Sequence, residues 1–161
     1  MVSLINGKKN SVKASEVEMT QVVLPQYANS VGTVFGGQIV SWIDICAAVS
    51  GQRHCRSSVV TASIDSVNFI ESIKQGHVVI IKSKLNAAFR SSMEIGTVVI
   101  SENPLTGERK KAMKAYLTFV SIGLDGKPKK VPKLVLETKE DERRAKEALA
   151  RRELRLKNRN S

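Results

Sequence analysis

One long apolar stretch, residues 38–55, constrains the fold more than any other feature of this sequence. Alanine, isoleucine and valine lie on every side of it when it is projected as a helix. We expect a helix of roughly 18 residues, about 27 Å long at 1.5 Å per residue. Because the helix is apolar all round, we expect it to be buried. Ser41 and Asp44 make it too polar to span a membrane.

Runs with the alternating pattern of strands lie on both sides of this stretch. The alternation predicts strands over residues 13–24, 59–70, 77–89, 95–101 and 110–122. One buried helix with a mostly antiparallel sheet makes an α+β domain. The chain has 161 residues, 42% of them hydrophobic, which suits a single domain. Its start lacks the order of a secretory signal and two cysteines make no disulfide framework, so we expect a soluble cytoplasmic protein.

The last stretch of the chain reads as a charged helix. Thr138 and Asp141 have the spacing of a capping box, with acidic residues near the start and basic residues near the end. We therefore divide the chain into a flexible arm (1–12), a folded domain (13–133) and a C-terminal helix (134–161). The helix is expected to lie in solvent or against another subunit. Its lack of aromatic side chains disfavours nucleic-acid binding.

The net charge of the chain is +11, from 26 basic and 15 acidic side chains. Such an excess attracts polyanions. Residues 109–133 hold eight lysines or arginines against a single acid, Asp125. We interpret this segment as the main basic patch, and it keeps a nucleic-acid-binding function open as an alternative.

Asp44 is the most informative single residue. A carboxylate within an apolar helix is costly unless it is paired or neutral. Carboxylates held in such surroundings are typical of general bases and nucleophiles. The structural alternative is that Asp44 lies on a wet stripe of the helix together with Ser41, three residues earlier.

Gly36 and Gly37 precede the helix and allow a ligand to approach the backbone closely. The free N–H groups of a helix N-terminus suit an anion or a developing oxyanion. Gly37 lies seven residues before Asp44, hence about 10 Å away along the axis. A base and an oxyanion donor must both lie roughly 3 Å from one reacting group. We therefore expect a site shared between two subunits and an obligate homodimer.

The remaining candidates are weaker. Cys46 and Cys55 are nine positions apart, on opposite faces of the helix, and His54 and His77 have no metal-ligand spacing with them. We expect structural roles for all four and no metal site. In the predicted turn 90–92, an arginine and two serines suit a phosphate group, although an ordinary polar turn explains them equally well.

Several blocks of the sequence together match a known family over about residues 13–125. The blocks are Pro25, Asn29–Gln38, Trp42-Ile43-Asp44, Arg53-His54, Val60–Phe69 and Arg90–Glu94. They resemble the hotdog-fold acyl-CoA thioesterases, most of all the short bacterial acyl-CoA hydrolases related to the brain-type cytosolic enzyme. The resemblance implies a hotdog fold, in which an antiparallel sheet wraps around one long central helix.

The resemblance also implies an activity, partners and residue roles. Acyl-CoA and water would give free CoA and a carboxylic acid, as in fatty acid metabolism, with no cofactor. Hexamers built from three dimers are common in the family. The implied catalytic residues are Asp44 as general base or nucleophile, Asn29 from the opposite subunit to place the water or thioester, and Gly36 and Gly37 as oxyanion donors. Arg90, Ser91 and Ser92 would hold the nucleotide of CoA.

Two departures and one rival function accompany the resemblance. Many relatives have a histidine where this chain has Ser30-Val31, and a glutamate where it has Ile45. We expect these changes to affect substrate preference. The rival is a non-catalytic module that senses acyl-CoA or binds nucleic acid. The basic segment 109–133 favours the rival, whereas Asp44, Asn29 and the two glycines favour the enzyme.

Overall fold

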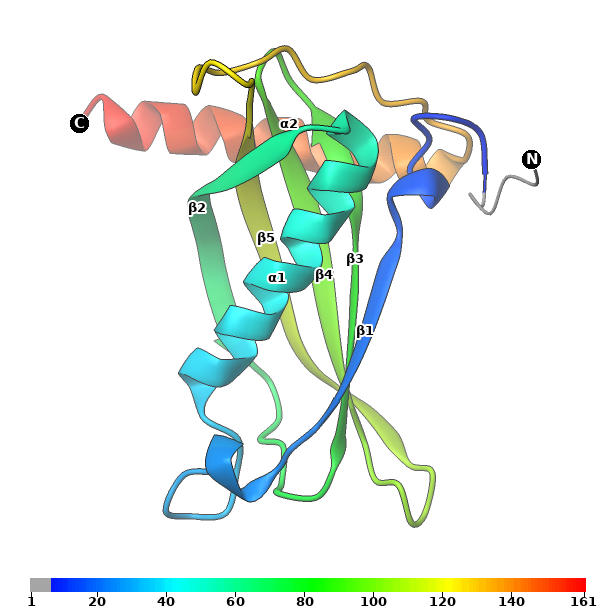
Figure 1. The fold of residues 1–161 in the computed structure, drawn as a ribbon, viewed down its shortest axis with the longest axis vertical. Helices are drawn as coiled ribbons and strands as arrows, with labels where there is room; N and C mark the ends of the chain where they lie inside the picture. Colours follow the sequence, from blue (N-terminus) through cyan, green and yellow to red (C-terminus); the bar gives the residue numbers. More distant parts are fainter. Residues whose placement is uncertain (1–6) are drawn as a thin grey trace.

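A curled antiparallel sheet wraps around one helix, as Figure 1 shows. The computed structural model describes residues 7–161, so the first half of the predicted arm, residues 1–6, lies outside the described residues. Over that range the sheet has five strands in the order β1-β3-β4-β5-β2. The α+β class is therefore confirmed. The elements are β1 (Val17–Val22), α1 (Gly36–Cys55), β2 (Ser58–Phe69), β3 (Val78–Ala88), β4 (Ser92–Glu102), β5 (Arg109–Ile122) and α2 (Lys139–Arg159).

The core lies between α1 and the concave face of the sheet. Side chains of one face of the helix, such as Ile39, Ile43 and Ala47, are at most 2% exposed. They pack against alternating residues of the central strands, among them Leu85 and Leu117. The apolar residues that alternate along the strands and those on one face of α1 therefore pack together in one core.

The prediction that α1 is buried all round is wrong. The sheet covers only one side of the helix, and a stripe with Gly37, Ser41, Asp44 and Ile45 faces outward. Ile45 is 51% exposed. The apolar character of that stripe therefore needs another explanation than burial within one chain.

Two predicted strand boundaries also differ from the structure. Residues 13–15 form a short 3₁₀ helix instead of the start of a strand. The hydroxyl of Ser15 donates to the carbonyl of Val12 at 2.6 Å and accepts from the amide of Leu85 at 3.0 Å. Such local hydrogen bonds compete with strand pairing. At the other boundary, β4 begins at Ser92 rather than Ile95.

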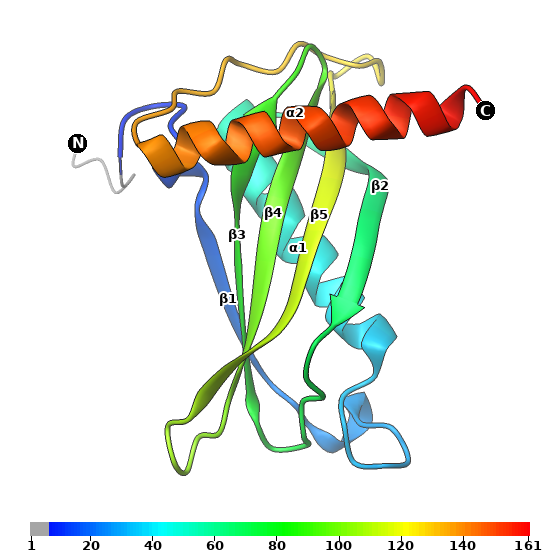
Figure 2. The same cartoon turned by 180° about the vertical axis from the view of Figure 1, so that it is seen from behind.

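The C-terminal helix and its predicted capping box are confirmed. The Thr138 side chain accepts from the amide of Asp141 at 3.0 Å, and the Asp141 carboxylate accepts from the amide of Thr138 at 3.2 Å. Figure 2 shows that α2 crosses the outer face of the sheet, on the side opposite to α1. Its Ala148 is fully buried there, so α2 is not simply a solvated tail.

A buried ionic cluster joins α2 to the sheet. Glu94 of β4 is 0% exposed, and Arg151 donates to its two carboxylate oxygens at 2.7 and 3.1 Å. Arg155 pairs with Asp65 of β2 at 2.6 Å and reaches Glu94 at 3.4 Å. Asn86 donates to Glu94 at 3.1 Å. Buried charges are stable only when they are paired in this way, so α2 and the outer face of the sheet form one unit.

Candidate active site

Asp44 lies on the outward stripe of α1, and its carboxylate is half-buried. The hydroxyl of Thr61 on β2 donates to its Oδ1 at 2.6 Å. Asp44 is thus not fully buried in the single chain, because only the edge strand β2 of the sheet reaches this side of the helix. Asp44 instead lies on an outward-facing stripe of α1 together with the exposed Ser41.

Thr61 is the functional candidate that the sequence analysis missed as a site residue. The β2–β5 register shifts between Thr61 and Ser63, so a bulge falls at this point of β2. Bulges re-aim side chains and are common beside active sites. A threonine in a strand is an ordinary residue, and only the bulge and the neighbouring helix turn its hydroxyl toward Asp44.

The helix N-terminus offers free amides, as predicted. The first amides to donate to a backbone carbonyl are those of Gln38 and Ile39, which both bond to Phe35 at 3.1 and 3.2 Å. No side chain caps this end of α1. A Cβ atom on Gly36 would lie 2.9 Å from the ring of Phe69, whereas one on Gly37 would meet nothing within 4 Å. The backbone is therefore open to a ligand at Gly37.

Asn29 lies in the loop before α1, at the same end of the molecule as the helix N-terminus. Its Oδ1 accepts from the amides of Val31 and Thr33 at 3.1 and 3.0 Å, and its Nδ2 donates to Thr33 Oγ1 at 2.9 Å. The ring of Tyr27 packs edge-on against Trp42 of α1, with 5.1 Å between ring centroids. These contacts hold the loop and its asparagine against the helix.

The predicted phosphate residues lie far from the helix N-terminus. Ser92 opens β4, and Arg90 and Ser91 form the turn before it, at the opposite end of the molecule in Figure 1. Arg90 has an exposed side chain, and its carbonyl accepts from the amide of Val131 at 2.8 Å. Within one chain, the structure thus brings Asp44 to Thr61 and Asn29 to the helix start, but it does not bring the 90–92 turn to either.

The cysteines and His54 are packed within the chain. Burial raises the pKa of the Cys46 and Cys55 thiols, which disfavours the thiolate that a nucleophile needs. Burial also lowers the pKa of His54, whose Nε2 lies 2.7 Å from the carbonyl of Pro132. Among the described residues, no group of three or more His, Cys, Asp and Glu is placed to hold a metal.

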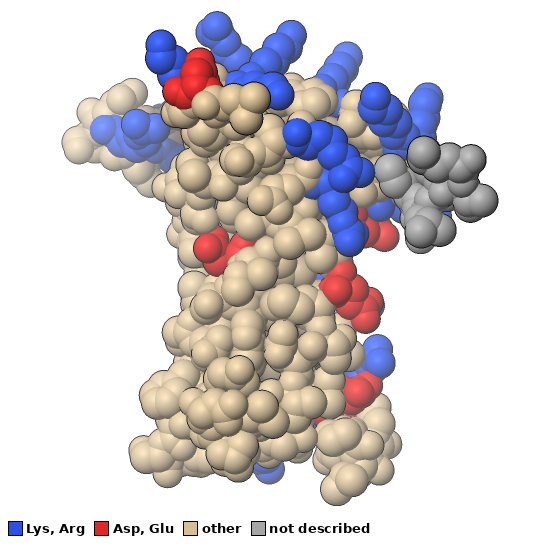
Figure 3. Space-filling model, viewed as in Figure 1, with Lys and Arg blue, Asp and Glu red and all other residues tan. Residues whose placement is uncertain are grey.

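The interpretation of residues 109–133 as a single basic patch is wrong. Arg109 begins β5 and Ile122 ends it, so the basic residues at the start of this strand and the lysines that follow it lie at opposite ends of the molecule. A strand of 14 residues spans about 45 Å. On the face in Figure 3, lysines and arginines gather at the end that carries α2 and the loop after β5, whereas the other half is mostly uncharged. The main argument for nucleic-acid binding is thereby lost.

An antiparallel sheet wrapped around one central helix is also the fold of solved acyl-CoA thioesterases, which is the hotdog fold. The thioesterase superfamily model matches residues 31–108. The chain belongs to this superfamily and, within it, to the acyl-CoA thioester hydrolases, because a relative of that class is 44% identical and is covered over 75% of its length.

Individual relatives support this assignment. The uncharacterized acyl-CoA thioester hydrolase YkhA of Bacillus subtilis is 44% identical over 129 residues, which are 80% of this chain and 75% of the relative. The cytosolic acyl coenzyme A thioester hydrolase of rat is 33% identical over 92% of this chain, which spans only 39% of that protein. The crystal structure of an apo-hexameric acyl-CoA thioesterase matches with a TM-score of 0.88 and 41% identity, covering 92% of this chain and 96% of the other. The resemblance seen in the sequence and the hotdog fold that it implied are confirmed.

Proposed function

We propose that this chain hydrolyses acyl-CoA to CoA and a carboxylic acid, in a site that two copies of the chain form together. The observation that carries the proposal is the Asp44–Thr61 hydrogen bond of 2.6 Å, on the same open helix stripe as Gly37. Liberation of free thiol from a series of acyl-CoA chain lengths tests it. A chain that binds acyl-CoA without releasing thiol would instead be a sensing module.

Asp44 is proposed to act on the thioester carbonyl. Thr61 holds Oδ1, and Oδ2 accepts no hydrogen bond from the described residues, which leaves it available to a water molecule or to the carbonyl carbon. As general base, Oδ2 takes a proton from the attacking water. As nucleophile, it forms an acyl intermediate that water then cleaves. Trapping of the acyl group by hydroxylamine during turnover, or ¹⁸O in Asp44 after a single turnover in ¹⁸O water, would establish the nucleophilic route, because the general-base route forms no acyl-enzyme and puts all of the ¹⁸O into the released acid.

The oxyanion and the leaving thiol need the other groups of the site. The amides of Gly36 and Gly37 would donate to the oxygen of the tetrahedral intermediate, and Asn29 would orient the water or the thioester. Arg90, Ser91 and Ser92 would bind the phosphates of CoA. About 10 Å along one helix separates Gly37 from Asp44, so a second copy must supply one of them.

Exposed apolar groups around Asp44 support a homodimer. Val60 and Phe69 of the edge strand β2 are 50% and 55% exposed, and Ile45 beside Asp44 is 51% exposed. An uncovered edge strand of 12 residues is a template for pairing with another chain. A homodimer would cover these groups, and three such dimers would make the proposed hexamer.

Complementation is expected between two inactive variants, Asp44→Asn and Asn29→Ala. After subunit exchange, half of the dimers are mixed and each mixed dimer has one intact site, so about a quarter of wild-type activity returns. Thiol release measures the recovered activity, and an exchange assay with labelled subunits measures the fraction of mixed dimers. Sites contained in one chain would recover nothing, and that result would contradict the shared site while leaving hydrolysis intact.

Replacement of Arg90 by alanine is expected to raise the KM for acyl-CoA several-fold with little change in kcat. A phosphate contact is made equally in the ground state and the transition state, so its loss acts on binding. The effect should shrink at high salt, which screens an exposed charge. Steady-state kinetics at two salt concentrations measure it, and an unchanged KM at low salt would move the CoA phosphates elsewhere.

We propose a cytoplasmic location for the chain. No helix of the described residues is long and apolar enough to cross a bilayer. The name of the rat relative supports a cytoplasmic location. We propose residues 13–133 as the part that carries the catalytic groups, preceded by the arm 1–12, with the helix segment 134–161 packed on its sheet as part of the same folded unit.

A further inference from the structure

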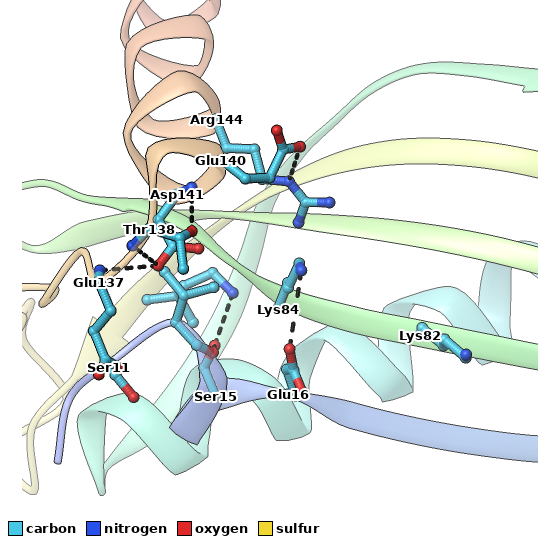
Figure 4. A network of polar contacts seen from close by, with 12 residues as sticks. Ser11, Ser15, Glu16, Lys82, Lys84, Glu137, Thr138, Glu140, Asp141 and Arg144 are labelled. Carbon is cyan, nitrogen blue, oxygen red and sulfur yellow. Dashed lines mark hydrogen bonds and ion pairs between the residues drawn. The ribbon is translucent and has the colours of Figure 1, made fainter. Parts of the chain in front are cut away.

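A recess lies on the outer face of the sheet, on the side away from Asp44. It has a volume of about 930 Å³, within the range of small-molecule sites. Strands β1, β3, β4 and β5 form its floor, and the first half of α2 forms its roof. At the β1 edge it extends to Lys13 and to Arg53 and Arg56 at the end of α1. Figure 4 shows part of it, with Lys84 of β3 and Arg144 of α2 on facing elements.

The strand register places basic side chains along both sides of this floor. Lys82 of β3 and Lys114 of β5 pair with the same residue of the intervening strand β4. Lys84 and Tyr116 likewise flank Gly96. Paired residues of neighbouring strands point to the same face, and strands lie about 4.8 Å apart. The two lysine-bearing strands are therefore about 10 Å apart. Between them the amide of Asn86 covers Gly96, since a Cβ atom there would lie 2.7 Å from its Nδ2.

The groove carries a large excess of positive charge. Ten basic and three acidic side chains line it. Lys82 and Lys84 each have a glutamate 3.9 Å away, at the outer limit of an ion pair, and such exposed pairs are weak. The three arginines of the roof are paired with glutamates, Arg143 and Arg144 with Glu140 and Arg151 with Glu94. The unmatched positive charge therefore lies mainly with the lysines, and it favours an anionic ligand. Further lining side chains form no ion pair within residues 7–161, namely Lys13, Arg56, Lys111 and Lys114.

The shape and the aromatic content of the groove favour phosphate groups over a nucleic-acid strand. The guanidinium of Arg151 lies 3.6 Å from the ring centroid of Tyr116 and covers one of its faces. Tyr116 is therefore not a free platform for base stacking, on which single-strand binding depends. The roof formed by α2 also makes the site a recess rather than an open track.

We infer that this groove binds a small anion with two or more phosphate groups. Lys82 and Lys84 contact it from one side and Lys114 from the other. Arg144, which also pairs with Glu140 at 3.2 Å, adds positive charge from the roof. The phosphates belong either to a free nucleotide or polyphosphate, or to the CoA half of a substrate molecule. The site is separate from the 90–92 turn, so it does not depend on the proposed role of Arg90.

Calorimetric titration of the full chain with inorganic triphosphate tests the inference. The variant Lys84→Gln/Lys114→Gln is expected to bind at least about tenfold more weakly, since each lost charged contact contributes roughly a factor of ten. Lys110→Gln/Lys127→Gln removes the same charge from residues outside the groove and is expected to bind as the wild type does. Equal weakening in both variants, or no binding of triphosphate by the wild type, would overturn the inference.

Competition identifies the source of the phosphates. If CoA displaces triphosphate and the groove variant has a raised KM for acyl-CoA, the groove takes the phosphates of the substrate. If ADP displaces triphosphate and KM is unchanged, the ligand is a free nucleotide.

Two other results would overturn the inference. One is tight binding of a single-stranded oligonucleotide without triphosphate binding. The other is a change of oligomeric state in the groove variant without triphosphate binding, which would mean that a second copy fills the groove.

Discussion

Replacing Asp44 by asparagine is expected to lower kcat for acyl-CoA hydrolysis by about 10²–10⁴-fold, the usual contribution of a positioned general base. The amide is nearly isosteric with the carboxylate, and its oxygen can still accept from Thr61. It can neither take a proton from water nor attack the thioester. The fold and the binding of CoA should therefore survive while turnover is lost.

Free-thiol release under saturating acyl-CoA measures this loss, with thermal unfolding as the check on folding. Ser41→Ala is the matched control, because Ser41 is exposed on the same stripe of α1 and has no proposed role. It should retain wild-type kcat. An Asp44→Asn enzyme with wild-type turnover on short and long acyl chains would remove Asp44 from the mechanism.

Replacing Arg151 by leucine is expected to lower the free energy of unfolding by about 3 kcal/mol, since removal of one partner leaves an uncompensated buried charge. Glu94 is 0% exposed, and its other cationic contact is Arg155 at 3.4 Å. The exposed carboxylates of α2 can hydrate when they lose a partner, but the buried Glu94 of β4 cannot. Urea unfolding at a fixed protein concentration measures the change.

Two further variants separate this effect from a general loss of charge on α2. Arg143→Leu removes an exposed arginine that pairs with Glu140 and Glu147 on the same helix, and it should change stability little. Glu94→Leu/Arg151→Leu removes both buried partners and should recover much of the loss, since Arg155 keeps Asp65. Equal effects of Arg151→Leu and Arg143→Leu would show that the buried cluster does not hold α2 in place.

Local patterns in the sequence were sufficient to predict the main elements. The apolar run 38–55 predicts the central helix, which the structure extends to Gly36–Cys55. Period-two alternation predicts the later strands to within a few residues of their ends. Thr138 and Asp141 predict a cap because a capping box joins residues only three positions apart. These features depend on neighbours in the chain, so they are readable without the tertiary structure.

Some of the candidate catalytic groups can be found from the sequence alone, and one of them cannot. Asp44 and the two glycines stand out in the sequence because a carboxylate and a Gly pair interrupt an apolar helix. The hydroxyl beside Asp44 does not stand out, because the β2 bulge and the packing of β2 against α1 bring Thr61 there from 17 residues away.

By itself, the sequence determined the helix, the strand pattern, the capped C-terminal helix and, by resemblance, the family. Only the tertiary structure decided which side of α1 the sheet covers, and hence that Asp44 is half-exposed. It also decided that α2 lies on the outer face of the sheet, held by a glutamate 57 residues away from its arginine. The physical reason is range: helix and strand periodicity arise between near neighbours, whereas burial and ion pairing depend on which distant segments meet.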